Sequence, residues 1–336
     1  MQYLPYLSEA GFEPTVASLF DAKYLEAMYS GRRNPVTLVK YLHRRLKQLK
    51  TETDLIWLEK EALPWVPWPL ERMLWPRNIP IVADYDDAIF HRYDQNSNAL
   101  IRFGLGRKIG HVMATAHTVF AGNEYLAQHA QRAGAHTTEI VPTVVDTDAY
   151  KTQQADRADG RPTIGWIGTP ETWNNFARNF VPILRATALQ ENALCRVVGA
   201  EPKSRTEMPF EYLPWNEETE ISLIKGMDVG LMPLPDTPWT RGKCGYKLIQ
   251  YMACGLPVVA SPVGVNSQII EHGVNGFLAE TDEEWQHSIT LLLKDAALRS
   301  RMGAAGLRAV EERFSLKVWA PRVRDMLSRT IHETGK

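Results

Sequence analysis

The sequence predicts an α/β protein built from parallel β-sheets. In the second half of the chain, apolar runs with the length of buried strands alternate with helical segments, as in a parallel sheet covered by helices on both faces. Strands and helices also alternate in the first half, and a polar stretch separates the two halves. The 336 residues are enough for two ordinary domains. We expect an N-terminal domain over residues 1–150, a linker over 151–161, a C-terminal domain over 162–313, and a final helix over 314–336 that returns to the N-terminal domain.

The composition excludes several classes of protein. Hydrophobic residues make up 44% of the chain and charged residues 23%, as in a soluble globular protein. A net charge of -1 gives no general attraction to nucleic acid, so no nucleic-acid partner is expected. The three cysteines, Cys195, Cys244 and Cys254, form neither a disulfide framework nor a metal-ligand pattern. Because no apolar run is long enough to cross a bilayer and no signal peptide follows Met1, we expect a cytoplasmic protein.

The first 50 residues predict a short helix over 2–10, a strand over 15–20 and a basic amphipathic helix. Residues 32–50 contain seven Lys or Arg and no acid. Four leucines form one helical stripe: Leu38, Leu42, Leu46 and Leu49. The solvated face of an ordinary packed helix explains this pattern. The alternative is contact with anionic lipid head groups, which would place the protein peripherally at the inner face of a membrane. Three tryptophans shortly downstream suit either a membrane interface or a core: Trp65, Trp68 and Trp75.

Acidic residues follow a predicted strand in the first half. Strands are expected over 54–59 and 79–83, and the second leads into Asp84, Asp86 and Asp87 and then His91. Carboxylates at the carboxyl end of a parallel strand lie where open α/β sheets bind ligands. They would accept hydrogen bonds from acceptor hydroxyls, with His91 handling a proton. Helix capping before Ala88 explains the same residues, and a divalent metal on Asp86 and Asp87 is the weaker alternative.

The remaining elements follow from apolar runs and from helix start and stop signals. The first half adds a long helix from Asn98 to Ala116, strands over 117–121 and 139–141, and a helix over 124–133 that ends at Gly134. The second half predicts strands over 163–167, 194–198, 210–213, 229–234, 257–260 and 276–279. The sequence contains none of the glycine-rich motifs that are typical of dinucleotide oxidoreductases, P-loop enzymes and α/β-hydrolases, so it does not favour these classes.

Two turns in the second half predict helix N-termini that point at one crevice. Gly168 ends a strand, Thr169 provides a cap and Pro170 occupies the first helical position, although ordinary helix initiation explains this turn equally well. The second turn lies in residues 232–265, where a strand ending at Leu234 and a Pro- and Gly-rich loop precede a helix that starts at residues 244–246 and stops at Gly255. The free N–H groups of such a helix form a ready site for a phosphate.

Charged and polar side chains accompany the second turn. Lys243 and Lys247 add positive charge there. Because Lys247 and Gln250 are three residues apart, they project from one helix face, one to meet an anion and the other to hydrogen-bond hydroxyls. A diphosphate joined to a sugar or a ribose needs both functions.

Several sequence blocks resemble one known family. Residues 242–266 (GKCGYKLIQYMACGLPVVASPVGVN) and 271–278 (EHGVNGFL) are similar to the donor-binding core of group 1, or family 4, retaining glycosyltransferases of the GT-B fold. Residues 121–126 (AGNEYL), 141–146 (VPTVVD) and 164–170 (IGWIGTP) resemble further blocks of that family. The resemblance therefore spans nearly the whole chain. It implies two Rossmann-like domains that face each other across a cleft.

The resemblance also implies roles for individual residues. The diphosphate would lie on the N–H groups around Gly242, Lys243, Cys244, Gly245 and Tyr246, with Lys247 beside it as a catalytic residue. Gly168 and Thr169 would lie by the phosphates. Tyr212 and Trp215 would lie beside the base, and Gln250 would bind the ribose hydroxyls. Asp84 and His91 are the catalytic candidates of the N-terminal domain, and Asp86 and Asp87 lie on the acceptor side.

The chain departs from the family pattern in three places. The two glutamates that the family spaces eight positions apart fall here at Gly242 and Gln250. The basic pair that follows the first glycine turn is absent, and Lys203 or Arg205 is expected to supply its charge. The first strand of the family would precede Gln2, so we expect an N-terminal domain that lacks this strand.

The resemblance implies transfer of a sugar from a nucleoside diphosphate sugar to an acceptor hydroxyl with retention of anomeric configuration. N–H groups and lysines would stabilise the leaving diphosphate, without a metal or another cofactor. A carbohydrate or a lipid-linked molecule is the expected acceptor, in the synthesis of surface polysaccharide or glycolipid. Two alternatives stay open: a protein that binds nucleotide sugars without turnover, and a nucleotide-sugar epimerase.

Overall fold

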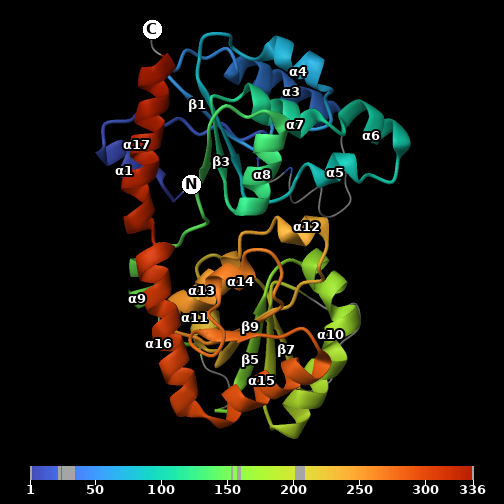
Figure 1. The fold of residues 1–336 in the computed structure, drawn as a ribbon, viewed down its shortest axis with the longest axis vertical. Helices are drawn as coiled ribbons and strands as arrows, with labels where there is room; N and C mark the ends of the chain where they lie inside the picture. The colour runs from blue at the N-terminus through green and yellow to red at the C-terminus, as the bar shows by residue number, and fades with distance from the viewer. Residues whose placement is uncertain are drawn as a thin grey trace. The chain divides into compact units, whose positions relative to one another are not determined.

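The computed structural model describes residues 2–21, 24, 35–152, 154–156, 160–200 and 209–334 (Figure 1). The chain divides into two compact units. Unit 1 contains Tyr3–Val141 and the chain from Ala320 onward, and unit 2 contains Pro142–Trp319. Each unit has a parallel β-sheet covered by helices, which confirms the predicted fold class.

The first unit boundary lies before residue 150, where the sequence predicted the end of the N-terminal domain. Helix α9 (Thr147–Thr152) belongs to unit 2, because Asp148 forms an ion pair with Lys317 at 2.7 Å and Val145 N donates to Phe314 O. The final helix, α17 (Leu316–Thr334), begins in unit 2 and continues in unit 1. There, the Thr330 hydroxyl hydrogen-bonds the Thr118 hydroxyl at 3.1 Å.

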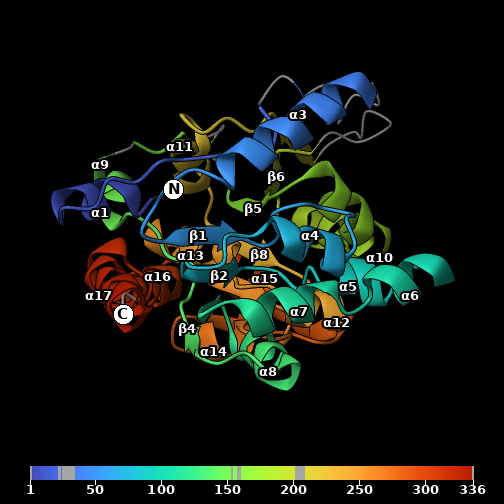
Figure 2. The same cartoon turned by 90° about the horizontal axis from the view of Figure 1, so that it is seen from above.

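Unit 1 is built on a sheet of parallel strands in the order β1-β2-β3-β4. The strands are β1 (Ile56–Glu59), β2 (Ile81–Tyr85), β3 (Thr118–Ala121) and β4 (Thr138–Ile140). The described helices, besides α17, are α1 (Leu4–Glu9), α3 (Pro35–Gln48), α4 (Trp68–Leu74), α5 (His91–Asp94), α6 (Ala99–Leu105), α7 (Lys108–Thr115) and α8 (Glu124–Ala133). Helix α6 lies at the edge of unit 1 in both views (Figure 1, Figure 2).

Three local predictions in unit 1 are wrong. Residues 15–20 form no strand, because Arg44 and Arg45 donate to the backbone carbonyls of residues 17–19, where a sheet would place a neighbouring strand. The long helix after Asn98 is two helices, α6 and α7, which are separated at Gly106. No helix begins at Ala88, so the aspartates before it cap none; α5 begins at His91 without a capping side chain.

Unit 2 is built on a parallel sheet in the order β10-β9-β8-β5-β6-β7. The strands are β5 (Thr163–Ile167), β6 (Leu194–Val198), β7 (Phe210–Leu213), β8 (Val229–Met232), β9 (Val258–Ala260) and β10 (Gly276–Leu278). The helices, besides α9, are α10 (Pro170–Gln190), α11 (Glu220–Lys225), α12 (Pro238–Arg241), α13 (Tyr246–Ala253), α14 (Asn266–Ile269), α15 (Asp282–Lys294) and α16 (Ala296–Arg313). All six strands agree with the predicted ones to within two residues at each end.

Alternating strand residues divide the core of unit 2 into two layers. Trp166 of β5 packs with Trp173 of α10 and Trp285 of α15 on one face of the sheet. Ile167, the next residue, packs with the buried side chains of α11 and α13 on the other face. Figure 1 shows α10 and α13 on opposite sides of the strands. Because every strand is covered on both faces, apolar runs without polar alternation were sufficient to predict this sheet.

A buried ion cluster fixes the helical layer of unit 1. The Lys108 ammonium on α7 lies 2.6 Å from Glu61 Oε2 and 2.9 Å from Glu71 Oε2 on α4, and it donates to Leu63 O. The Tyr93 hydroxyl donates to Glu61. These lysine and glutamate side chains are almost fully buried, and the single cation is the shared counter-charge of both carboxylates. Burial raises the pKa of Glu71, while Lys108 opposes that shift.

Lys108→Met is expected to destabilise the protein by about 3–5 kcal/mol, because both glutamates lose their buried counter-charge. Urea unfolding followed by tryptophan fluorescence measures this loss. Arg329→Met is the control, since Arg329 forms an exposed pair with Glu139 at 3.6 Å, which is worth less than about 1 kcal/mol. Equal unfolding midpoints for the two variants would contradict this role of Lys108.

Candidate functional site

The sheet order of unit 2 defines where a ligand would bind. From β5 the chain proceeds outward to β6 and β7, and it then returns to the other side of β5 to form β8, β9 and β10. The loops that leave β5 and β8 therefore diverge at the carboxyl edge of the sheet. Open α/β sheets bind ligands in the crevice at this switch point.

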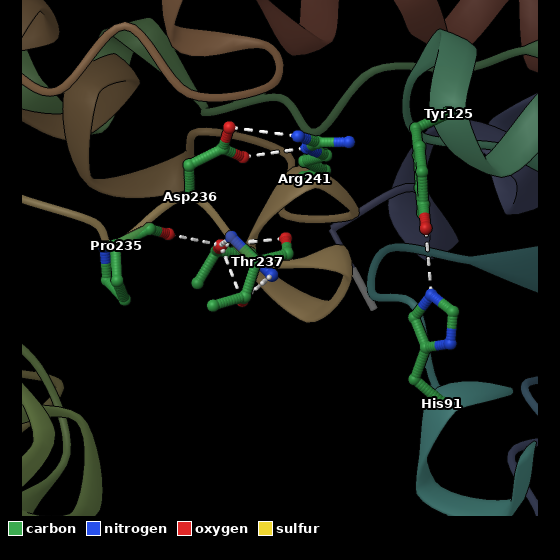
Figure 3. Close-up of polar contacts among 7 residues, drawn as sticks. His91, Tyr125, Pro235, Asp236, Thr237 and Arg241 are labelled. Atoms are coloured by element: carbon green, nitrogen blue, oxygen red, sulfur yellow. Dashed lines mark hydrogen bonds and ion pairs between the residues drawn. The ribbon is translucent and has the colours of Figure 1, made fainter. Parts of the chain in front are cut away.

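The loop after β8 is held rigid by its own polar contacts (Figure 3). Thr237 and Thr240 form a reciprocal capping box at α12, and the Thr240 hydroxyl also donates to Pro235 O. The Arg241 guanidinium donates to both oxygens of Asp236 at 2.7 and 2.9 Å. These contacts within the loop define the geometry with which the chain enters the next helix.

Gly245 directs the backbone from this loop into α13. Its φ is 70°, in the left-handed region, and a side chain there would collide with Ile269. No side chain caps α13, so the N–H groups of its first turn have neither an intrahelical nor a side-chain partner. Gly242 and Cys244 are buried in the preceding turn, whereas Lys243 is partly exposed. The structure therefore brings the predicted residues 242–246 together at one helix N-terminus.

Lys247 places a cation beside this N-terminus. Its ammonium lies 4.2 Å from the centre of the Trp166 ring and borders Gly168, where a side chain would collide with both residues. In the described part of the chain, the ammonium has no ion pair or hydrogen bond. Burial, followed by the charge of the neighbouring Lys243, lowers the pKa of Lys247 to about 7. A half-buried amine with no acidic partner favours an anionic ligand.

The other residues predicted to contact the nucleotide sugar were expected to lie either by its phosphates or by its base. Gly168 lies beside the lysine, but the Thr169 hydroxyl accepts from Thr172 N and caps α10, as ordinary helix initiation requires. Trp215 is 53% exposed. Tyr212 is partly buried and packs against Trp173 of the core cluster, with ring centres 6.1 Å apart. Trp215 therefore has the more exposed ring of the two residues predicted to lie beside the base.

Glu220 is a site residue that sequence reasoning missed. Gln250 is 2% exposed, and its amide donates to one carboxylate oxygen of Glu220, while the Trp215 indole N–H donates to the other. Glu220 and Gln250 are 30 positions apart. The available signal was weak: an acid at the first position of a helix, five residues after an exposed tryptophan.

The acidic residues of unit 1 are more dispersed than the sequence predicted. Asp84 lies within β2 rather than after it, and it accepts from the Trp57 indole at 3.0 Å. Burial is the main cause that raises the pKa of Asp84 to about 7; the Trp57 hydrogen bond opposes the shift, and the charges of Asp86 and Glu59 contribute to it. Asp86 forms an ion pair with Lys60 at 3.0 Å.

His91 lies in a small polar cluster of unit 1. Its Nδ1 is 2.8 Å from Asp94 Oδ1, and its Nε2 is 2.8 Å from the Tyr125 hydroxyl (Figure 3). His129 stacks on the neighbouring Phe90, and burial lowers the pKa of His129 to about 4. Through its contact with Nδ1, Asp94 can orient the His91 ring, a role that the sequence did not predict. The assignment of Asp84, Asp86, Asp87 and His91 to an acceptor stays a prediction.

The described residues contain neither a candidate metal cluster nor a helix that could span a membrane. Among them, no cluster of three or more His, Cys, Asp or Glu side chains could hold a metal ion. Over the same part of the chain, no helix has the length and hydropathy needed to cross a membrane. Lys203 and Arg205, the predicted sources of further positive charge, lie outside the described residues.

Comparisons with known sequences agree with the position of the site. The family described as "Glycosyl transferases group 1" matches residues 161–295. The chain is 35% identical over 72 residues to the N-acetyl-alpha-D-glucosaminyl L-malate synthase of Bacillus anthracis, which is 21% of the chain and 19% of that protein. It is 24% identical over 178 residues to the D-inositol 3-phosphate glycosyltransferase of Thermobispora bispora, 52% of the chain and 37% of that protein. The matches thus span well under half of these relatives.

Solved structures resemble nearly the whole chain. Sucrose-phosphate synthase from Thermosynechococcus elongatus superposes with a TM-score of 0.68 at 15% identity, covering 90% of this chain and 81% of that one. Anabaena Alr3699/HepE in complex with UDP-glucose superposes with a TM-score of 0.67 at 17% identity, covering 93% and 90%. At these identities the likeness establishes the fold.

Two parallel α/β units, a phosphate-type helix N-terminus at the switch point of unit 2 and these comparisons lead to one assignment. The chain has the GT-B fold, and its residues 161–295 match the family described as "Glycosyl transferases group 1".

Proposed function

We propose that the protein is a glycosyltransferase that moves a sugar from a nucleoside diphosphate sugar to an acceptor hydroxyl. The observation that carries this proposal is the Lys247 ammonium, which lies beside the uncapped N-terminus of α13 at the switch point of the sheet. A diphosphate would supply the negative charge that this amine and these N–H groups lack. The family match to residues 161–295 supports the same function.

The charge of the leaving diphosphate determines which protein groups the reaction needs. As the sugar–phosphate bond breaks, negative charge accumulates on the diphosphate, and groups that already point at it lower the barrier. Lys247, Lys243 and the first N–H groups of α13 are the residues for this task. They supply positive charge without a divalent metal, so we propose transfer that requires no metal ion and no organic cofactor.

We further propose retention of the anomeric configuration. In this mechanism the acceptor hydroxyl approaches on the face that the diphosphate leaves, and a phosphate oxygen of the donor takes its proton. No protein nucleophile is then needed. A carbohydrate or lipid-linked acceptor, in the synthesis of surface polysaccharide or glycolipid, is part of the same proposal.

A binding protein without turnover is the second candidate. It is favoured by one observation: the positions where the family carries two glutamates hold Gly242 and Gln250 here. Release of free sugar or transfer to an acceptor from a bound nucleotide sugar would exclude this candidate.

Lys247→Met is expected to weaken binding of the donor about 10–100-fold, because one charge-assisted contact to the diphosphate is lost. Isothermal titration with UDP, GDP and ADP and their sugar conjugates measures the change. The fold should persist, since the substitution removes a half-buried amine that has no acidic partner among the described residues. Lys294→Met, at a side chain that is 63% exposed, is the matched control. Donor affinity that matches the control would refute the role of Lys247.

We propose that unit 1 associates with an anionic membrane through α6 rather than through the basic helix α3. Two of the α3 arginines, Arg44 and Arg45, hold the carbonyls of residues 17–19 and thus have a structural task. On α6, by contrast, Phe103 is 94% exposed and Leu100 is 79% exposed on the same face. No acid occurs from residue 95 to 123, so the charged residues of α6 and its flanking turns, Arg102 and Arg107, are positive.

The double variant Leu100→Glu/Phe103→Glu is expected to lose most of its binding to vesicles of phosphatidylcholine and phosphatidylserine in sedimentation assays. Lys47→Glu, on the exposed side of α3, is expected to keep most of the binding. The opposite ranking of the two variants would assign the membrane contact to α3, as one interpretation of the sequence predicted. Donor titration, which should be unchanged, confirms that both variants are folded.

A further inference from the structure

Gln250 is committed to contacts inside unit 2. Its side chain is 2% exposed, its amide N–H donates to Glu220 Oε1, and it also hydrogen-bonds the Tyr150 hydroxyl. The residue that the sequence suggested as the direct contact for hydroxyls is therefore a support for its neighbours. Glu220, which accepts the hydrogen bond from Gln250, is partly exposed and can offer its carboxylate oxygens to a ligand.

Two donors fix the Glu220 carboxylate. Gln250 donates to one oxygen and the Trp215 indole N–H to the other. A carboxylate offers about four acceptor positions, so one position on each oxygen stays available to a ligand. Because both contacts come from different elements, α13 and the loop after β7, the carboxylate is held in one orientation before a ligand arrives.

This carboxylate lies in the same site as the Lys247 ammonium. Lys247 and Gln250 project from one face of α13, about 5 Å apart along its axis. On the strand side, Lys247 borders Gly168, and Gly168 O lies against Gly199. A side chain at Gly199 would approach Trp215 Cβ to 3.1 Å. These neighbours connect the lysine, through the ends of β5 and β6, to the tryptophan and Glu220.

The order of groups in this site matches the order of groups in a nucleotide. A cation and free N–H groups lie at one end, an exposed indole lies at the other, and a fixed carboxylate accompanies the indole. A diphosphate, a base and the ribose between them would present charges, a flat ring and two neighbouring hydroxyl donors in that order.

We propose that Glu220 binds the 2′ and 3′ hydroxyls of the donor ribose, with Gln250 and Trp215 as its positioning residues. This inference rests on the proposed function, since it assigns a part of the same donor. Each ribose hydroxyl donates to the free side of one carboxylate oxygen. A nucleotide that lacks one hydroxyl leaves an acceptor without its donor, so the site selects ribonucleotides over deoxyribonucleotides.

The test combines nucleotides that lack one ribose hydroxyl with a variant that lacks the Glu220 carboxylate. UDP, GDP and ADP are titrated into the protein by calorimetry, and whichever binds is compared with its 2′-deoxy and 3′-deoxy analogues. We expect each deoxy analogue to bind about tenfold more weakly than the ribonucleotide. In Glu220→Gln the ribonucleotide should lose about tenfold, and the difference between it and its analogues should largely disappear.

Controls separate this inference from the function on which it rests. Inorganic pyrophosphate should bind wild type and Glu220→Gln equally, which shows that the variant is folded around the phosphate end. Glu217→Gln, at an exposed neighbour, should discriminate like wild type. Trp215→Phe keeps the ring but removes the N–H donor, and it should reduce the discrimination partially. Undiminished discrimination in Glu220→Gln overturns the inference alone, whereas no nucleotide binding to wild type overturns the proposed function as well.

Discussion

One electrostatic constraint governs the donor site: the Lys247 ammonium lies between α13 and the end of β5 without an acidic partner among the described residues. Folding places it there because α13 must bury its apolar face, including Leu248 and Ile249, against the sheet. The first turn of that helix is thereby fixed over the switch point of unit 2. The hydrophobic core thus positions the Lys247 side chain in a site where its charged form is unfavourable. A bound diphosphate would stabilise that charged form.

The surroundings of the lysine follow from the same constraint. Gly168 and Gly245 are required because side chains there would collide with neighbours of the site. The Asp236–Arg241 pair and the Thr237 capping box fix the loop that precedes α13. A diphosphate bound there would contact backbone N–H groups and lysines, which leaves the polar side chains of α11 and α13 for the rest of the donor.

Sequence patterns predicted the sheets well and the polar contacts poorly. The six strands of unit 2 were predictable because each is buried on both faces and is therefore continuously apolar. Residues 15–20 have the composition of a strand, but arginines from α3 bind their carbonyls. Glu220 was not predictable, since its contact with Gln250 joins residues 30 positions apart through the fold. The Gly turn before α13 predicted a helix N-terminus with Lys247 beside it, because these features are local in sequence.

Proton uptake on donor binding is the most direct test of contact between Lys247 and the diphosphate. At pH 8 the Lys247 amine, with a pKa of about 7, is mostly neutral in the free protein. A bound diphosphate raises that pKa, so binding of a nucleotide sugar, whose diphosphate has no ionisation near neutrality, takes up a proton. Calorimetry in buffers of different ionisation enthalpy should show uptake close to one proton in wild type and none in Lys247→Met. Binding without proton uptake in wild type would show that the Lys247 amine does not contact the diphosphate.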